Sequence, residues 1–318
     1  MKRKVRVLIT GASGFIGRNI FESFRRRTDV ELFGTYRSRR FFRSANLWEV
    51  DLRQENEVRL LLASLQPDVL IQAAAVTSGA EDIAQRPEIH VHDNVIMNAH
   101  LLAAAHDKAV PHVILFSCAL VYPSEDRLVK ETDADFRSIQ PVYSAAWVKV
   151  ACEEFAKFYA SRGRTSFSVI RHSNIYGPYD KFGTGAHLVG GKIAEVARAQ
   201  DGDTIVIWGS GEPKRDLLYV GDLERLVEGL MGSSQVGFQI YNAGWGSSLS
   251  VREVTEKIIK VSGKKLSVVC DTTKPEMPTQ PALCSLKARH DLRWIPRIAW
   301  QTGLARTYKW YVDSERER

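Results

Sequence analysis

The sequence predicts an α/β fold, in which helices cover both faces of a doubly wound parallel sheet and a smaller α/β lobe follows at the C-terminal end. In the first half, β-branched and aliphatic runs alternate with helical segments. Parallel strands need such crossover helices. After Gly177-Pro178 the alternation stops, and loops and short elements take over. A chain of 318 residues is long enough for both parts.

Six strands and four helices are predicted in the first half of the chain. Short runs rich in aliphatic and β-branched residues predict the strands. The predicted strands are residues 5–10, 30–36, 46–50, 69–75, 113–117 and 166–171. The predicted helices are residues 18–27, 55–65, 91–108 and 145–159. In a sheet of this kind, ligands bind outside the carboxyl ends of the strands.

The second half predicts a lobe that lies over this edge of the sheet. Residues 179–212 are rich in loops, with one helix and a strand-like segment at 204–208. The last third mixes short helices and strands around a proline-rich loop. We expect residues 1–175, completed by about 213–245, to form the sheet domain. Residues 176–212 and 246–318 are expected to form the substrate-binding lobe.

The composition argues against several classes of protein. The net charge is +7, but the basic residues are dispersed and no nucleic-acid-binding signature accompanies them, which predicts a solvated basic surface. No apolar run approaches the roughly 20 residues of a membrane span. The four cysteines are scattered, with no CxxC pair or metal spacing, as is typical of a reducing compartment. We therefore expect a cytoplasmic protein with no metal site and no nucleic-acid or membrane partner.

A glycine turn lies between the first predicted strand and the first helix. It reads Gly11-Ala12-Ser13-Gly14-Phe15-Ile16-Gly17. Glycine permits a tight turn and lets the backbone approach a pyrophosphate, which then lies among unpaired N–H groups at the helix N-terminus. The turn therefore predicts a dinucleotide-binding Rossmann domain. The expected contacts are Gly11, Ser13, Gly14, Phe15, Ile16 and Gly17.

The end of the second predicted strand indicates which dinucleotide is bound. An NAD site usually has an acid there for the ribose 2′-hydroxyl. This strand instead runs into Arg37, Arg39 and Arg40, with no acid. A guanidinium can pair bidentately with a 2′-phosphate. The sequence therefore favours NADP(H) over NAD(H), with Arg37 as the first contact and Arg39 or Arg40 as the next. A solvated loop of arginines is the alternative.

Several further segments carry a resemblance to a known family. They are residues 51–52, 73–75, 92–98, 117–122, 171–178 and 215–223. From about residue 5 to 310, the chain resembles the extended short-chain dehydrogenases/reductases, which include nucleotide-sugar epimerases, dehydratases and reductases. Residues 94–99, 177–182 and 208–215 most resemble the GDP-L-fucose synthases, the epimerase–reductases of this family. The resemblance implies hydride transfer between nicotinamide and a carbon of a nucleotide-diphosphate sugar. It also implies a homodimer formed through the helices predicted at 91–108 and 145–159.

The resemblance also assigns contact residues. The further cofactor contacts are Asp51, Leu52, Ala73, Ala74, Ala75, Asn94 and Lys149. Of these, Lys149 holds the nicotinamide ribose. The substrate contacts are Asn174, His187, Trp208 and Arg215. The resemblance places Arg215 at the nucleotide diphosphate, with a surface salt bridge as the alternative.

The catalytic pair departs from the family pattern. In this family, a Tyr and a Lys four residues later share a helix face, where Lys lowers the pKa of the proton-exchanging Tyr. Counted forward from the preceding proline, Tyr143 is the family tyrosine and Trp147 stands in place of the lysine. Counted back from residues 171–178, Lys149 is the lysine and Ala145 stands in place of the tyrosine. Either Tyr143 precedes the helix and turns back into the site, or the pair is lost.

Two neighbouring positions are altered as well. The Ser/Thr of the family falls on Cys118, a weak hydrogen-bond donor, with Ser117 just before it. The GDP-L-fucose synthases use a Cys as one epimerisation acid/base, and here that position is Leu120. Their partner His matches His187, for which a polar loop histidine is the alternative. The loss at Leu120 argues against 3,5-epimerisation of that kind. The candidate catalytic residues are Tyr143, Lys149, Cys118, Ser117 and His187.

The substrate end also differs, because residues 279–284 replace a basic pair and an Asp of the GDP-L-fucose synthases. The base of the nucleotide therefore stays open. Two functions follow from the sequence. One is an NADP(H)-dependent enzyme acting on a nucleotide-activated sugar. The other is a cofactor-binding protein without ordinary hydride chemistry, which the altered Tyr/Lys spacing favours.

Overall fold

A seven-stranded, entirely parallel sheet forms the centre of the protein. The computed structural model describes residues 3–38, 44, 46–77, 85–139, 144–183, 185–233 and 236–317. The strand order is β11-β7-β5-β4-β1-β2-β3, the doubly wound order in which the chain moves outward on both sides of β1. Its strands are β1 (Val5–Thr10), β2 (Val30–Tyr36), β3 (Leu47–Glu49), β4 (Val69–Gln72), β5 (His112–Cys118), β7 (Ser166–His172) and β11 (Phe238–Ala243). The predicted α/β fold class is confirmed.

One strand ends earlier than predicted. Residues 73–75 were assigned to the fourth strand, but β4 stops at Gln72. The reason lies in its neighbour β1, which pairs with β4 as far as Thr10 and then enters the glycine turn. The Ala73 N–H still donates to the Thr10 carbonyl, but β1 ends there, and the alanines leave the sheet. They are then free to border the edge where ligands bind.

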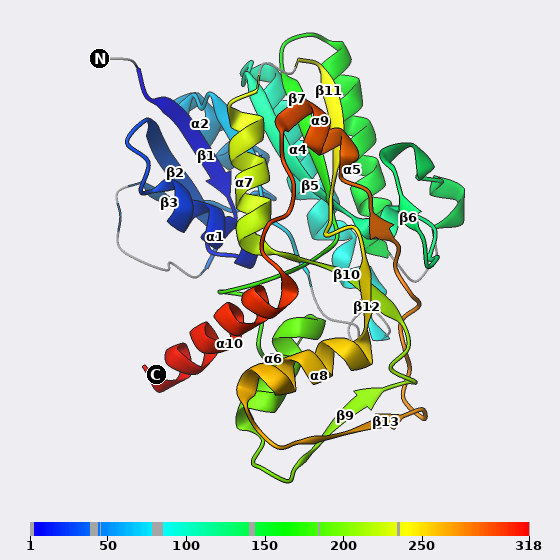
Figure 1. The fold of residues 1–318 in the computed structure, drawn as a ribbon. Coiled ribbons are helices and arrows are strands. Elements are labelled where there is room, and N and C mark those ends of the chain that lie inside the picture. The colour runs from blue at the N-terminus through cyan, green and yellow to red at the C-terminus, as the bar shows by residue number, and fades with distance from the viewer. Residues whose placement is uncertain are drawn as a thin grey trace.

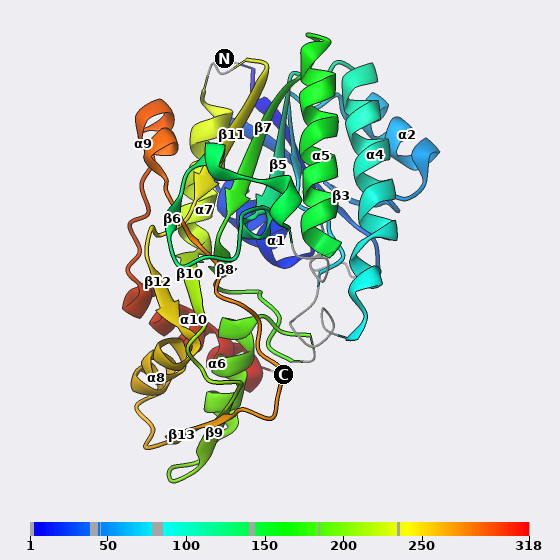
Figure 2. The ribbon, with the colours of Figure 1, turned by 90° about the vertical axis from the view of Figure 1, so that its right-hand side faces the viewer.

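Helices cover both faces of the sheet (Figures 1 and 2). One face carries α2 (Glu55–Leu65), α4 (His92–Asp107) and α5 (Ser144–Ser161), and the other carries α1 (Phe15–Phe24) and α7 (Val220–Met231). Because successive strand residues point to opposite faces, Leu8 packs with the first group and Val7 and Ile9 with the second. Both faces of each central strand are thus buried, as parallel sheets require.

A smaller lobe lies beyond the carboxyl ends of the strands, at the bottom of Figure 1. It packs α6 (Leu188–Arg198), α8 (Val251–Ser262) and α10 (Trp300–Arg316) around Tyr176, Leu217 and Leu304. The remaining strands form three small sheets, namely β8 (Asn174–Tyr176) with β10 (Lys214–Tyr219) and β12 (Ser248–Ser250), β9 (Thr204–Trp208) with β13 (Ser267–Asp271), and β6 (Leu128–Val129) with β14 (Ala282–Leu283). α9 (Leu286–Leu292) packs near β11 and α7. The exact domain boundaries stay a prediction.

A buried ion pair ties α5 to β7 near the edge where the site lies. The Arg171 guanidinium donates to both Glu153 carboxylate oxygens, at 2.6 and 3.1 Å, and both side chains are at most 3% exposed. The same guanidinium donates to the Tyr122 hydroxyl and to the Glu131 carbonyl. These contacts fix the end of β7 against the helix that carries Lys149. Within the described ranges, every helix is too short or too polar to span a bilayer.

Candidate active site

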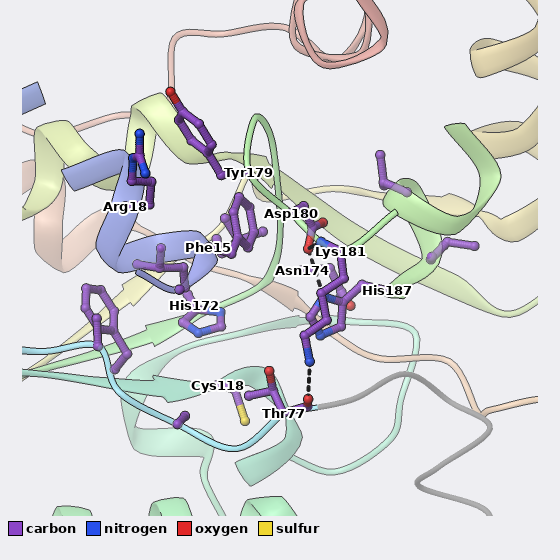
Figure 3. A pocket seen from close by; sticks show the side chains of 18 of the residues that line it. Phe15, Arg18, Thr77, Cys118, His172, Asn174, Tyr179, Asp180, Lys181 and His187 are labelled. Carbon is purple, nitrogen blue, oxygen red and sulfur yellow. Dashed lines mark hydrogen bonds and ion pairs between the residues drawn. The ribbon is translucent and has the colours of Figure 1, made fainter. Parts of the chain in front are cut away.

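A cavity of about 1050 Å³ lies between the carboxyl ends of the central strands and the lobe (Figure 3). Its wall is formed by the glycine turn, the segments after β4 and β5, the start of α5, and residues that follow β7. The predicted site residues that line it are Ser13, Gly14, Phe15, Ile16, Ala73, Ala74, Ala75, Asn94, Cys118, Lys149, Asn174 and His187. The structure thus brings most of the predicted residues to one space, while their individual roles stay predictions.

The glycine turn is shaped by two glycines that lie just behind the cavity wall. Gly11 has a φ of +67°, and a Cβ there would lie 2.6 Å from the Ala74 Cα. A Cβ on Gly17 would lie 2.3 Å from the Gly11 carbonyl oxygen. Gly14 caps α1, and no described side chain caps the first turn, which also lacks an acid. The N–H groups at this end therefore fit an anion such as a pyrophosphate.

Arg37 follows β2 at the other end of this binding edge. Its guanidinium is half-exposed and lies 3.9 Å from an Asp93 oxygen. Arg53, which the sequence analysis missed, binds Asp51 bidentately at 2.6–3.2 Å and Asp93 at 3.1 Å. The hydrogen bond from Arg53 lowers the pKa of Asp51 to about 2. Both carboxylates are therefore already paired with Arg53, and within the described part of the chain the Arg37 guanidinium has only the long contact to Asp93. Arg39 and Arg40 lie outside the described residues.

Asn94 organises the segment that follows β4. Its amide donates to the carbonyls of Val76 and His90, and its oxygen accepts from the Val76 N–H at 2.8 Å. The side chain therefore fixes the loop that borders the cavity. Leu52, by contrast, is buried in the hydrophobic core, and neither it nor Asp51 lines the cavity.

Lys149 and Ala145 both face the cavity from the first turns of α5. The Lys149 amine donates to the Phe116 carbonyl at 2.7 Å. Because the two residues are four apart, they share a helix face. The pair named by the count back from residues 171–178 thus lies on the cavity side of the helix, and which residue takes the part of the tyrosine stays a prediction. Trp147 is 45% exposed and does not line the cavity, and Tyr143 lies outside the described residues.

Cys118 and His172 end β5 and β7 as a directly paired couple. Burial raises the pKa of the Cys118 thiol, which therefore stays protonated at neutral pH. Ser117 points to the opposite face of the strand and does not line the cavity. Burial also lowers the pKa of His172, to about 4, so its ring is neutral. His172 lines the cavity. It lies in the family-like segment 171–178, but no role was predicted for it, because its place beside Cys118 follows from the pairing of β5 with β7.

His187 and Asp180 form a second couple, on the loop before α6. The His187 Nδ1 lies 3.1 Å from an Asp180 oxygen, and the carboxylate is buried while the imidazole is partly exposed. Such a carboxylate holds the orientation of the ring. The Lys181 amine reaches across to donate to the Thr77 carbonyl (Figure 3). No role was predicted for Asp180.

Two predicted substrate contacts lie away from the cavity wall. Arg215 is buried, and its guanidinium donates to the carbonyls of Lys214, Met277 and Pro278. Trp208 ends β9 and is 45% exposed, with the Lys274 amine 5.9 Å from the centre of its ring. Asn174 does line the cavity, where its amide donates to Gln280 at 2.9 Å. No group of three or more His, Cys, Asp and Glu side chains among the described residues could hold a metal ion.

Comparisons with known proteins cover most of this chain. The family described as "NAD dependent epimerase/dehydratase family" matches residues 7–244. The GDP-L-fucose synthase of Escherichia coli K12 is 29% identical, over 98% of each chain. The dTDP-4-dehydro-6-deoxy-D-allose reductase of Streptomyces bikiniensis is 26% identical, over 96% of this chain and 95% of the relative. The UDP-glucose 4-epimerase of Thermotoga maritima, solved with UDP-glucose, superimposes with a TM-score of 0.87 at 21% identity, over 98% of this chain and 100% of that one.

Proposed function

Because this chain belongs to the NAD dependent epimerase/dehydratase family, we propose that it is an NADP(H)-dependent oxidoreductase or epimerase acting on a nucleotide-diphosphate sugar. The observation that carries the proposal is the continuous cavity, which joins the glycine turn to Lys149 and His187. The names of the two relatives, a GDP-L-fucose synthase and a dTDP-sugar reductase, support the substrate class. The base and the sugar stay open.

The chain's own residues would hold the cofactor at two points. The free N–H groups after Gly14 fit the pyrophosphate, and Arg37 supports a 2′-phosphate, and therefore NADP(H) over NAD(H). Lys149, whose amine can only donate, would hold the nicotinamide ribose. When bound, the nicotinamide supplies or accepts a hydride at its ring.

Proton movement at the sugar would come from other residues. In our proposal, Tyr143 or a water moves the proton on the oxygen of the reacting carbon, and His187, oriented by Asp180, exchanges a proton on the far side of the cavity. Leu120 lines the wall where a second acid/base would be needed and has no proton to exchange. This favours reduction, or epimerisation at one centre, over 3,5-epimerisation.

The test begins with binding and proceeds to turnover. NADPH and NADH are titrated into the purified protein by calorimetry, and absorbance is then followed with a panel of NDP-4-keto-6-deoxyhexoses and NDP-hexoses. We expect tighter binding of NADPH and oxidation of it by at least one keto-sugar. If neither dinucleotide binds, the proposal is wrong.

A cofactor-binding protein without ordinary hydride chemistry is the second candidate. The observation that favours it is Ala145, which places no proton-carrying group four residues before Lys149. The same experiment separates the two candidates. Binding without turnover on any sugar, unaltered by Tyr143→Phe, would support this second function, whereas loss of turnover in Tyr143→Phe would support the enzyme.

We also propose that the protein forms a homodimer through α4 and α5. These two helices pack side by side on one face of the sheet (Figure 2). Three large side chains on α5 are exposed along one stripe, namely Trp147, Phe155 and Phe158. An apolar stripe of this kind suits burial against a second copy. Light scattering at micromolar concentration should give the mass of a dimer, and a monomer mass would contradict the proposal.

A further inference from the structure

His172 presents one ring nitrogen to the cavity. Its Nδ1 lies 2.7 Å from the Ser173 carbonyl oxygen, which can only accept, so Nδ1 carries the proton. The ring is neutral at pH 7, because its pKa lies at about 4, and Nε2 therefore holds a lone pair. No described residue hydrogen-bonds this Nε2. Figure 3 shows the ring pointing into the cavity from the wall that also carries Cys118.

The sheet topology indicates which part of a dinucleotide reaches this wall. With the pyrophosphate at the turn after β1, one half of the molecule extends over β2 and β3, where Arg37 lies. The nicotinamide half then extends over the ends of β4, β5 and β7, and His172 ends β7. Lys149, which would hold the ribose in the proposed function, lines the same wall of the cavity.

The chemistry of this wall makes His172 the suitable acceptor. A nicotinamide carboxamide presents an N–H₂ donor, which needs an acceptor in a site shielded from water. The Lys149 amine only donates, and the protonated thiol of Cys118 is a weak partner. The Phe116 carbonyl already accepts from Lys149. A neutral ring also avoids the repulsion that an imidazolium would exert on an oxidised, cationic nicotinamide.

We propose that His172 positions the nicotinamide ring by accepting, at Nε2, a hydrogen bond from the carboxamide N–H. This inference rests on the proposed function, since it requires a bound dinucleotide. His172 is thus a positioning residue that fixes which way the ring faces. The backbone beside it is held by the buried pair of Arg171 and Glu153, so the imidazole has a rigid base.

The test compares two cofactors that differ at the carboxamide. The oxidised 3-acetylpyridine analogue of NADP has a methyl ketone there and lacks the N–H donor. Affinities for NADP⁺ and for this analogue are measured by calorimetry on the wild type and on His172→Leu, His172→Gln and His290→Leu. Since one such hydrogen bond is worth about five- to tenfold in affinity, we expect the wild type to prefer NADP⁺ by about that ratio.

The variants separate the possible results. His172→Leu should bind both cofactors with a ratio near one, whereas His172→Gln, which keeps an acceptor oxygen, should restore part of the preference. His290→Leu, at an exposed histidine of α9 that does not line the cavity, should keep the wild-type ratio. An unchanged ratio in His172→Leu, or the absence of any preference in the wild type, overturns this inference but leaves the proposed function standing. If no variant and no wild type binds either dinucleotide, both fall.

Discussion

At one end of the cavity, the glycine turn supplies four consecutive lining residues, 13–16. At the other end, Lys149, Cys118, His172 and His187 come from four separate segments. The first end depends on backbone geometry, which a few glycines determine. The second depends on strand pairing and helix packing, which hold distant side chains together. The comparison explains why one continuous motif in the sequence marks the dinucleotide end, whereas no single motif marks the reacting end.

Breaking the buried ion pair between Arg171 and Glu153 should give the largest loss of stability, and this loss should arise at the reacting end. Glu153→Gln leaves the Arg171 guanidinium buried beside a neutral partner. We expect the free energy of unfolding to fall by about 3–5 kcal/mol, as for other buried pairs that lose one member. Urea unfolding followed by circular dichroism measures this.

The adjacent residue supplies the control. Glu154 is exposed and lies 3.9 Å from Lys157, so Glu154→Gln should change the stability by less than about 1 kcal/mol. Equal effects of the two substitutions would mean that the buried pair does not anchor the end of β7.

The dinucleotide end is tested by adding one methyl group. In Gly11→Ala, the positive φ and the contact with the Ala74 backbone act together, and we expect stability to fall by about 2–4 kcal/mol. NADPH binding should weaken by at least about a hundredfold, because the turn must shift. Calorimetry on the folded protein measures the affinity.

Gly163 provides a matched control for Gly11. It also has a positive φ, of +76°, but a Cβ there meets nothing within 4 Å. Gly163→Ala should therefore cost only the backbone strain, about 1–2 kcal/mol, with NADPH affinity unchanged. Comparable loss of binding in both variants would show that strain, and not the close approach of backbone at the turn, explains the result.

The preference for NADPH over NADH gives a second test of the dinucleotide end. Removing the guanidinium in Arg37→Ala should lower NADPH affinity by about tenfold, the value of a charge-assisted hydrogen bond at a half-exposed site, and leave NADH affinity unaltered. Arg25 is similarly exposed but pairs with Glu22 at the end of α1. Arg25→Ala should therefore leave both affinities as they are. An equal loss for NADPH and NADH in Arg37→Ala would exclude a contact with the 2′-phosphate.

The same contrast explains what the sequence could predict. Periodicity and the glycine turn are local signals, so the fold class, the membership of the family and the position of the turn were predicted correctly. His187 and Lys149 were found through motifs and do line the cavity. His172 was missed because its position beside Cys118 comes from the pairing of β5 with β7, which no neighbouring residue encodes.

Other parts of the site depend on packing that a motif cannot report. Only the helix in the structure shows that Ala145 lies beside Lys149 on the cavity side, because the two ways of counting along the sequence disagree. Arg215 matched a motif, yet its guanidinium is occupied by the backbone carbonyls of a segment more than sixty residues away. The contact between Asp180 and His187 depends on how one loop folds, which a motif does not report.

A pH titration gives the smallest expected effect, at the outer margin of the dinucleotide end. Arg53 depresses the pKa of Asp51 to about 2 in the folded protein, against about 3.9 in an unfolded chain. A carboxylate with a depressed pKa stabilises the fold above its unfolded pKa and loses that contribution as the pH falls toward the folded value. Relative to Asp51→Asn, the wild type should therefore be more stable by up to about 1 kcal/mol above pH 5, since the pair is partly solvated. The difference should close between about pH 4 and pH 2, as measured by urea unfolding at each pH. A difference that persists at pH 2 would mean that the asparagine disturbs the loop itself, and that the ion pair with Arg53 contributes nothing to stability.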